Sequence, residues 1–297
     1  MNGLLIVNKA SGPTSHRVVQ EIRALFPKVK VGHAGTLDPA ATGVLPICLG
    51  KATRIVEYLM DLPKEYRAEL ELGATTETGD AQGKITGRFP VPVIAKEAVE
   101  QLFLSLTGEQ QQVPPPYSAI KYQGKPMYYW TRRGVEVKLK PRKIQIYRLE
   151  LVEWRYPGRP HLVFETKCSR GTYIRTLAEE IGRRLGTGAF INALRRLSVG
   201  IFTLKEALTM DEIRKRAGLS EPGELILPVD RGLSHLPALT RGTVDIERLQ
   251  QGQPLLLEQA PGPGSLCRVY DPGGRFKTLA ALDEVDGKLW LKPKINF

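Results

Sequence analysis

The chain has few of the residues that build disulfides and metal sites. Its 297 residues include only three cysteines and four histidines, all far apart and without a C-x-x-C pair. This odd, dispersed set excludes a disulfide framework and gives no zinc-ligand spacing, so no metal site is expected. No run approaches about 18 consecutive apolar residues, so no membrane span is predicted. The first residues have neither a basic leader nor a small-residue cleavage site, and we predict a cytoplasmic location.

Several common catalytic motifs are also missing. The sequence has no G-x-x-x-x-G-K-[ST], no glycine fingerprint for dinucleotides, no G-x-S-x-G and no H-E-x-x-H. Phosphoryl transfer, hydride transfer and metal-assisted hydrolysis therefore have no support in the sequence.

The chain has fewer acidic than basic residues. The chain has 31 Asp and Glu against 43 Lys and Arg, which gives a formal net charge of +12. Such a surplus of cations favours binding to a polyanion such as nucleic acid. Residues 235–297 hold eight Lys and Arg against seven Asp and Glu, so the surplus belongs to residues 1–234.

Apolar residues in the first two hundred positions alternate between strand and helix patterns. Residues 4–9 and 66–72 are typical of strands, the latter with apolar and charged side chains in strict alternation. In residues 15–26, Val18, Ile22 and Phe26 share one helical face, behind a cap at Thr14 or Ser15. Helices are also predicted at 95–106 and 172–185, and strands at 142–154 and 161–169. Together these elements predict an α+β fold with a mixed, mainly antiparallel sheet and flanking helices.

Two changes in residue pattern divide the chain further. Residues 233–297 consist of short strand-like runs separated by turns, which predicts a small β-rich domain after a larger domain of residues 1–232. Within the larger domain, residues 117–143 interleave cations with aromatic rings, as in a segment that lies along a phosphate backbone. The alternative is that the rings are core and the charges a solvated face. The predicted RNA contacts are Lys121, Lys125, Arg132 and Arg133.

A single carboxylate lies in the least bulky loop of this basic protein. The stretch from Gly32 to Pro46 reads GHAGTLDPAATGVLP, and Asp38 is its one acidic residue. An Asp before Pro often initiates a turn, with its side chain capping nearby backbone N–H groups. The spacing alone favours that structural interpretation.

Four segments together resemble a known family. In chain order they are GHAGTLDPAATGVLPICLGKATR, KEYRAELELGATTETGDAQG, VPPPYSAIKYQGKPMYYWTRRG and CSRGTYIRTLAEEIG. They resemble the bacterial tRNA pseudouridine synthase family of the TruB type, and residues 233–297 resemble its PUA domain. The resemblance implies a cofactor-free isomerisation of uridine to pseudouridine at position 55 in the T-loop of tRNA. The target nucleotide would have to be flipped out of the folded loop.

The resemblance also implies roles for individual residues. Asp38 matches the essential aspartate, acting as a nucleophile or a base, and Arg175 matches the arginine that pairs with it. Tyr66 matches the tyrosine that stacks on the target base. Further substrate-binding positions are His33, Tyr173, Leu194 and Lys9. Structural roles, as a loop hydrogen-bonding residue, core residue or solvated charge, remain open for three of these, His33, Leu194 and Lys9.

The spacing of Tyr173 and Arg175 leads to a local prediction. Residues two apart diverge on a helix, so a strand or irregular segment is expected to present both side chains to one pocket.

The expected partner is the T-loop arm of tRNA, with a monomeric protein and no obligate protein partner. Two other functions stay open. One is a protein that binds or folds tRNA with little catalysis, and the other is a synthase that acts on another RNA.

Overall fold

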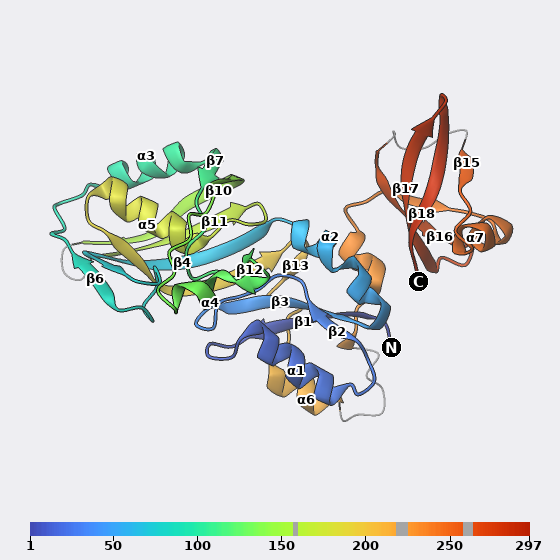
Figure 1. Cartoon of the computed structure of the whole chain (residues 1–297), viewed down its shortest axis with the longest axis horizontal. Helices are drawn as coiled ribbons and strands as arrows, with labels where there is room; N and C mark the ends of the chain where they lie inside the picture. The colour runs from blue at the N-terminus through green and yellow to red at the C-terminus, as the bar shows by residue number, and fades with distance from the viewer. Residues whose placement is uncertain (157–159, 218–224, 258–263) are drawn as a thin grey trace.

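The computed structural model describes residues 1–156, 160–217, 225–257 and 264–297. These residues form a large sheet flanked by helices and a smaller, separate sheet near the C-terminus (Figure 1). No helix in these ranges is both long enough and apolar enough to span a lipid bilayer.

The large sheet has nine strands and is mainly antiparallel. Its main path, in spatial order, is β1 (Gly3–Lys9), β3 (Thr42–Leu49), β12 (Ala189–Val199), β4 (Lys64–Leu72), β11 (His161–Cys168), β10 (Arg142–Arg155) and β7 (Gly108–Gln112). Two short strands, β2 (Val31–His33) and β13 (Phe202–Thr203), pair with β3 and β12. The pairing of β12 with β3 is parallel, and all other neighbours are antiparallel. The predicted α+β fold class is confirmed.

Strand β4 illustrates how the sequence forms this sheet. Tyr66, Ala68 and Leu70 are buried on one face, whereas Arg67 is exposed on the other and Glu69 is partly exposed. The covered face belongs to a core that continues into the flanking helices. Period-two alternation thus separates a packed face from an open face on the central strand.

Helices cover the two halves of the large sheet. Helices α3 (Lys96–Leu106) and α5 (Ile174–Leu185) contact β10 and β12, while α1 (Ser15–Leu25) and α6 (Met210–Ala217) lie beside β2 and β1 (Figure 1). Of the two predicted caps for α1, Thr14 is the one observed, because its hydroxyl accepts from the Arg17 N–H at 3.1 Å. The shorter helices are α2 (Val56–Asp61), α4 (Met127–Thr131) and α7 (Thr243–Gln250).

The two halves meet at a seam between β3 and β12. Their parallel pairing is short, with Arg195 opposite Thr42 and Arg196 opposite Gly43. Strand β3 begins at Thr42, so the loop of residues 34–41, which contains Asp38, enters the sheet at this seam. The topology therefore brings Asp38 to the junction of β3 and β12.

The second sheet has five strands and its own apolar core. Its order is β14 (Ala238–Thr240), β16 (Leu266–Tyr270), β17 (Phe276–Val285), β18 (Lys288–Asn296) and β15 (Leu255–Leu257). A shared apolar cluster joins it to the large sheet, and the Tyr270 hydroxyl donates to Asp230 Oδ2 at 2.7 Å. These five strands agree with the predicted β-rich character of the C-terminal part. The boundary at residues 232/233 and the PUA-like character stay predictions.

Candidate active site

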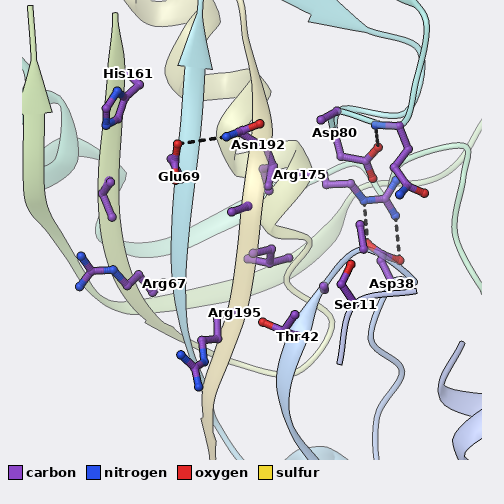
Figure 2. Close-up of a pocket in the computed structure, with 18 of the residues that line it drawn as sticks. Ser11, Asp38, Thr42, Arg67, Glu69, Asp80, His161, Arg175, Asn192 and Arg195 are labelled. Atoms are coloured by element: carbon purple, nitrogen blue, oxygen red, sulfur yellow. Dashed lines mark hydrogen bonds and ion pairs between the residues drawn. The ribbon is translucent and has the colours of Figure 1, made fainter. Parts of the chain in front are cut away.

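Asp38 forms an ion pair with Arg175 at the seam of the large sheet. The Arg175 Nε lies 2.9 Å from Asp38 Oδ2, and Arg175 Nη2 donates to Asp38 Oδ1 at 3.4 Å (Figure 2). The Arg175 side chain is 6% exposed, whereas that of Asp38 is 39% exposed. The arginine therefore forms a buried support for a carboxylate that opens onto a cleft.

Arg175 also binds two other segments of the chain. Its Nη1 donates to the Thr78 carbonyl at 2.8 Å, and its Nη2 donates to the Tyr117 carbonyl at 2.8 Å. One planar guanidinium thus joins the Asp38 loop, the turn after β5 (Ala74–Thr76) and the start of the 117–143 segment.

The helix predicted at residues 172–185 is confirmed as α5, so the strand or irregular segment expected to present Tyr173 and Arg175 together was wrong for Arg175. Arg175 is the second residue of helix α5, and Tyr173 is the N-cap residue that precedes it. Both backbone groups of Tyr173 bond the Gln112 side chain, which accepts at 2.8 Å and donates at 3.0 Å. The helix points Arg175 into the seam, while Tyr173 lies outside the cleft lining.

Burial and neighbouring charges act on the pKa of the Asp38 carboxyl. Burial raises it most and the Asp80 carboxylate adds to the rise, whereas the Arg175 guanidinium and the Lys9 ammonium work against it. A carboxylate that must act as a nucleophile or a base has to be ionised. The ion pair therefore favours the ionised form of Asp38 in a site that partly excludes water.

Lys9 lies entirely buried under the Asp38 loop. Its ammonium donates to the carbonyls of Ala10, Pro39 and Ala41 at 2.9, 3.0 and 2.7 Å. Burial lowers the pKa of Lys9 to about 8, although Asp38 opposes that change. In this conformation the Lys9 side chain has no exposed surface and its ammonium bonds the backbone on either side of it, so contact of Lys9 with substrate stays a prediction.

A second buried cation, Arg196, was missed in the sequence. It is 1% exposed and donates to the carbonyls of Val44, Gly35 and Thr36 at 2.7, 3.2 and 3.4 Å. A Cβ added to Gly43, whose φ is +105°, would lie 2.1 Å from the Arg196 carbonyl oxygen, so only glycine fits there. Consecutive side chains on a strand point to opposite faces, so the Arg195–Arg196 pair could have indicated that one cation is buried.

The cleft beside Asp38 has a volume of about 710 Å³. Of the predicted site residues, Asp38, Arg175 and Leu194 line it. Asp80 also lines it and was not predicted, and its Oδ1 accepts from the Thr78 hydroxyl at 2.6 Å and the Gln82 N–H at 3.0 Å. The cleft extends from the seam across the open face of the sheet (Figure 2).

Tyr66 and His33 lie near the seam but outside the cleft lining. Tyr66 is 9% exposed and packs in the main core, and burial raises the pKa of its phenol. His33 ends strand β2, and burial lowers the pKa of its imidazole. Both side chains are therefore neutral near pH 7 in this conformation.

The 117–143 segment presents cations on aromatic rings. It contains a small hairpin of β8 (Lys121–Tyr122) and β9 (Lys125–Pro126), followed by α4. The Arg133 guanidinium lies 3.6 Å from the centre of the Tyr129 ring, and the Lys125 ammonium lies 5.7 Å from the same ring. Within the described ranges, none of the four predicted RNA-contacting cations forms an ion pair. Their charges are available to an external anion.

Comparison with known proteins places the chain in a family. Residues 23–174 match the TruB family pseudouridylate synthase N-terminal domain, and residues 175–234 match the tRNA pseudouridylate synthase B C-terminal domain. The tRNA pseudouridine synthase B of Syntrophotalea carbinolica is 46% identical over 254 residues, which are 86% of this chain and 82% of the relative. That of Geobacillus kaustophilus is 42% identical over 283 residues, which are 93% and 98% of the two chains.

A solved structure shares the fold. An H/ACA RNP bound to a substrate RNA containing 2′-deoxyuridine contains a chain that is 25% identical with a TM-score of 0.75, over 99% of this chain and 84% of that chain. The similarity covers both sheets and agrees with the matches in sequence. The chain belongs to the TruB family of pseudouridylate synthases.

Proposed function

We propose that this enzyme converts uridine to pseudouridine at position 55 in the T-loop of tRNA, with Asp38 as its essential carboxylate. Membership of the family supports isomerisation of uridine in tRNA. The observation that carries the role of Asp38 is its ion pair with the buried Arg175 at the mouth of the cleft.

The proposed reaction balances within the substrate. The N1–C1′ bond of the nucleotide breaks, the base turns, and a C5–C1′ bond forms. The hydrogen on C5 leaves as a proton and N1 gains a proton, so no oxidant or reductant is needed. Asp38 acts on the nucleotide as nucleophile or base, while Arg175 holds the carboxylate ionised and aimed. Tyr66, close to the seam, is proposed to stack on the base and assist proton transfer at C5.

Binding of the folded RNA has to offset the cost of flipping the nucleotide. Unstacking a base costs a few kcal/mol, which stacking and phosphate contacts can recover. We assign phosphate contacts to Lys121, Lys125, Arg132 and Arg133, because these cations form no ion pair within the described part of the chain and the segment is bonded to Arg175 through the Tyr117 carbonyl. The proposed PUA-like domain, residues 233–297, would hold the helical part of the arm by its shape.

Deleting the gene tests the proposed function directly. Pseudouridine mapping of total RNA should show loss at position 55 of tRNA T-loops and no loss in ribosomal RNA. Wild-type protein should restore the modification in the same cells. Loss confined to another RNA would contradict the proposed substrate, and unchanged maps would contradict the enzymatic role.

The basic segment leads to a prediction about salt. Replacing Lys125 and Arg133 together by Gln should lower the slope of log K for tRNA against log salt by about 0.7 for each lost phosphate contact. Fluorescence titrations across a salt series would measure the slope. The control is Arg183→Gln, which removes an exposed cation that pairs with Glu180 on α5. Equal slopes for the double variant and the wild type would refute the assigned contacts.

A further inference from the structure

Most charged residues of the cleft already have a partner in the protein. Arg175 pairs with Asp38, Arg155 with Glu153, and Arg67 with Glu165. Among the cleft residues that the structure describes, Arg195, Glu69 and Asp80 form no ion pair. Asp80 Oδ1 already accepts from the Thr78 hydroxyl and the Gln82 N–H, which leaves Arg195 and Glu69 as the charges of the open sheet face that are available to something that enters the cleft.

A bulge in strand β12 places an amide beside this carboxylate. Ile191 is opposite Leu70 and Ala193 is opposite Glu69, so Asn192 is an extra residue in the strand. Such bulges re-aim side chains and are frequent next to active sites. Asn192 is exposed, lines the cleft, and donates from Nδ2 to Glu69 Oε1 at 3.0 Å (Figure 2).

The hydrogen bond leaves part of each side chain unused. Asn192 retains a second amide hydrogen and its amide oxygen, which Figure 2 shows on the side away from Glu69. Glu69 retains its second carboxylate oxygen. The pair therefore presents one donor and two acceptors at the open face of the sheet.

The position of Glu69 limits what can bind there. A carboxylate in a groove that receives a polyanion repels phosphate, so its favourable partner is an N–H group. In nucleic acids, Glu accepts from the amino group of cytosine, and Asn bonds the N6 and N7 edge of adenine. Both bases carry an exocyclic amine, whereas uracil carries none. Arg195, on the same strand and in the same cleft, suits the phosphate of such a nucleotide.

We propose that Glu69 and Asn192 form a second nucleotide subsite, which reads the exocyclic amine of a base next to the target uridine while Arg195 binds its phosphate. This inference rests on the proposed function. It makes the open face of β4 and β12 a specificity-determining surface for the sequence around the modified nucleotide.

Exchanging one group on the RNA tests the subsite. T-arm hairpins are made in which each loop cytosine or adenine in turn is replaced by uracil or hypoxanthine, which exchanges the amine for a carbonyl. At one position the exchange should lower kcat/KM of the wild type about 10-fold, as expected for one good base contact. With Asn192→Ala or Glu69→Ala, the two hairpins should differ by less than about 2-fold, since the reading groups are gone.

Matched variants separate this effect from general damage. Glu65 lies on the same face of β4 as Glu69, but its carboxylate pairs with Lys167 and Arg148. Glu65→Ala should therefore keep the wild-type preference for the hairpin that carries the amine. Arg195→Gln should weaken binding of both hairpins alike and lower the salt slope by about 0.7. Thermal melting checks that each variant is folded.

The outcomes distinguish the two proposals. If the wild type forms pseudouridine but has no amine preference, or if Asn192→Ala keeps that preference, the subsite is refuted and the proposed function stands. If the wild type modifies no hairpin, the proposed function fails. In that case the ratio of the Kd values for the hairpins with and without the amine, measured for the wild type and the same variants, tests the subsite independently of catalysis.

Discussion

Asp38→Asn should lower kcat for pseudouridine formation by at least about 10⁴-fold, the scale seen when a nucleophile or its base is removed. The amide keeps the shape of the side chain, so the loop held by Lys9 and Arg196 should be unchanged. It has no negative charge and cannot act as nucleophile or base. Release of tritium from C5-labelled uridine in tRNA measures the reaction, because C5 loses its hydrogen when it bonds to the sugar.

Binding should separate the chemical role of Asp38 from a structural one. The Kd for tRNA should change by less than about 3-fold, since the lost interaction acts in the transition state. The control is Asp61→Asn, which removes the carboxylate of an exposed ion pair with Arg170 and should retain full activity. Tritium release by Asp38→Asn at a rate near that of the control would show that the essential carboxylate is misassigned.

Replacing Arg175 should change both the rate and the acid side of the pH profile. Activity needs ionised Asp38, so kcat/KM falls as the pH decreases through the pKa of this carboxyl. Burial raises that pKa and Arg175 opposes the rise. Arg175→Gln removes the opposing charge, so its acid limb should move to higher pH than that of the wild type. Rates measured over a pH series at tRNA concentrations well below KM give kcat/KM and hence the acid side of the profile.

A second variant separates charge from geometry at Arg175. Arg175→Lys keeps the positive charge, so its acid limb should stay close to that of the wild type. A single ammonium cannot hold Asp38 and the carbonyls of Thr78 and Tyr117 in one plane, and we expect a loss of about 10²-fold in kcat from misplacement. If kcat/KM of Arg175→Gln and of the wild type falls at the same acid pH, Arg175 does not lower the pKa of Asp38.

The position of the Asp38 loop explains why buried cations matter at this site. Residues 34–41 connect β2 to β3 and belong to no strand, so sheet pairing does not fix them. Lys9 and Arg196 instead donate to backbone carbonyls on both sides of Asp38. Buried carbonyls without such donors would carry a desolvation cost, so the two cations stabilise the loop and preorganise the carboxylate.

The amino-acid sequence by itself determined the classes of structure and chemistry. Period-two alternation in residues 66–72 and helical spacing in residues 15–26 are local signals, and both elements form as predicted. The resemblance of four segments, in the same chain order, indicated the family and the pairing of Asp38 with Arg175. In the structure, Arg175 Nε lies 2.9 Å from Asp38 Oδ2. These inferences depend on neighbours in sequence or on whole motifs.

Only the tertiary structure decided which charges are buried and where side chains point. The sequence left a solvated charge open for Lys9 and did not single out Arg196, and the burial of both depends on carbonyls about 30 and 160 residues away. The start of α5 overrides the two-residue spacing of Tyr173 and Arg175, and the Asn192 bulge exists only in the pairing of β12 with β4. Long-range contacts fix such features because burial and register are properties of the assembled sheet, and residue types alone do not encode them.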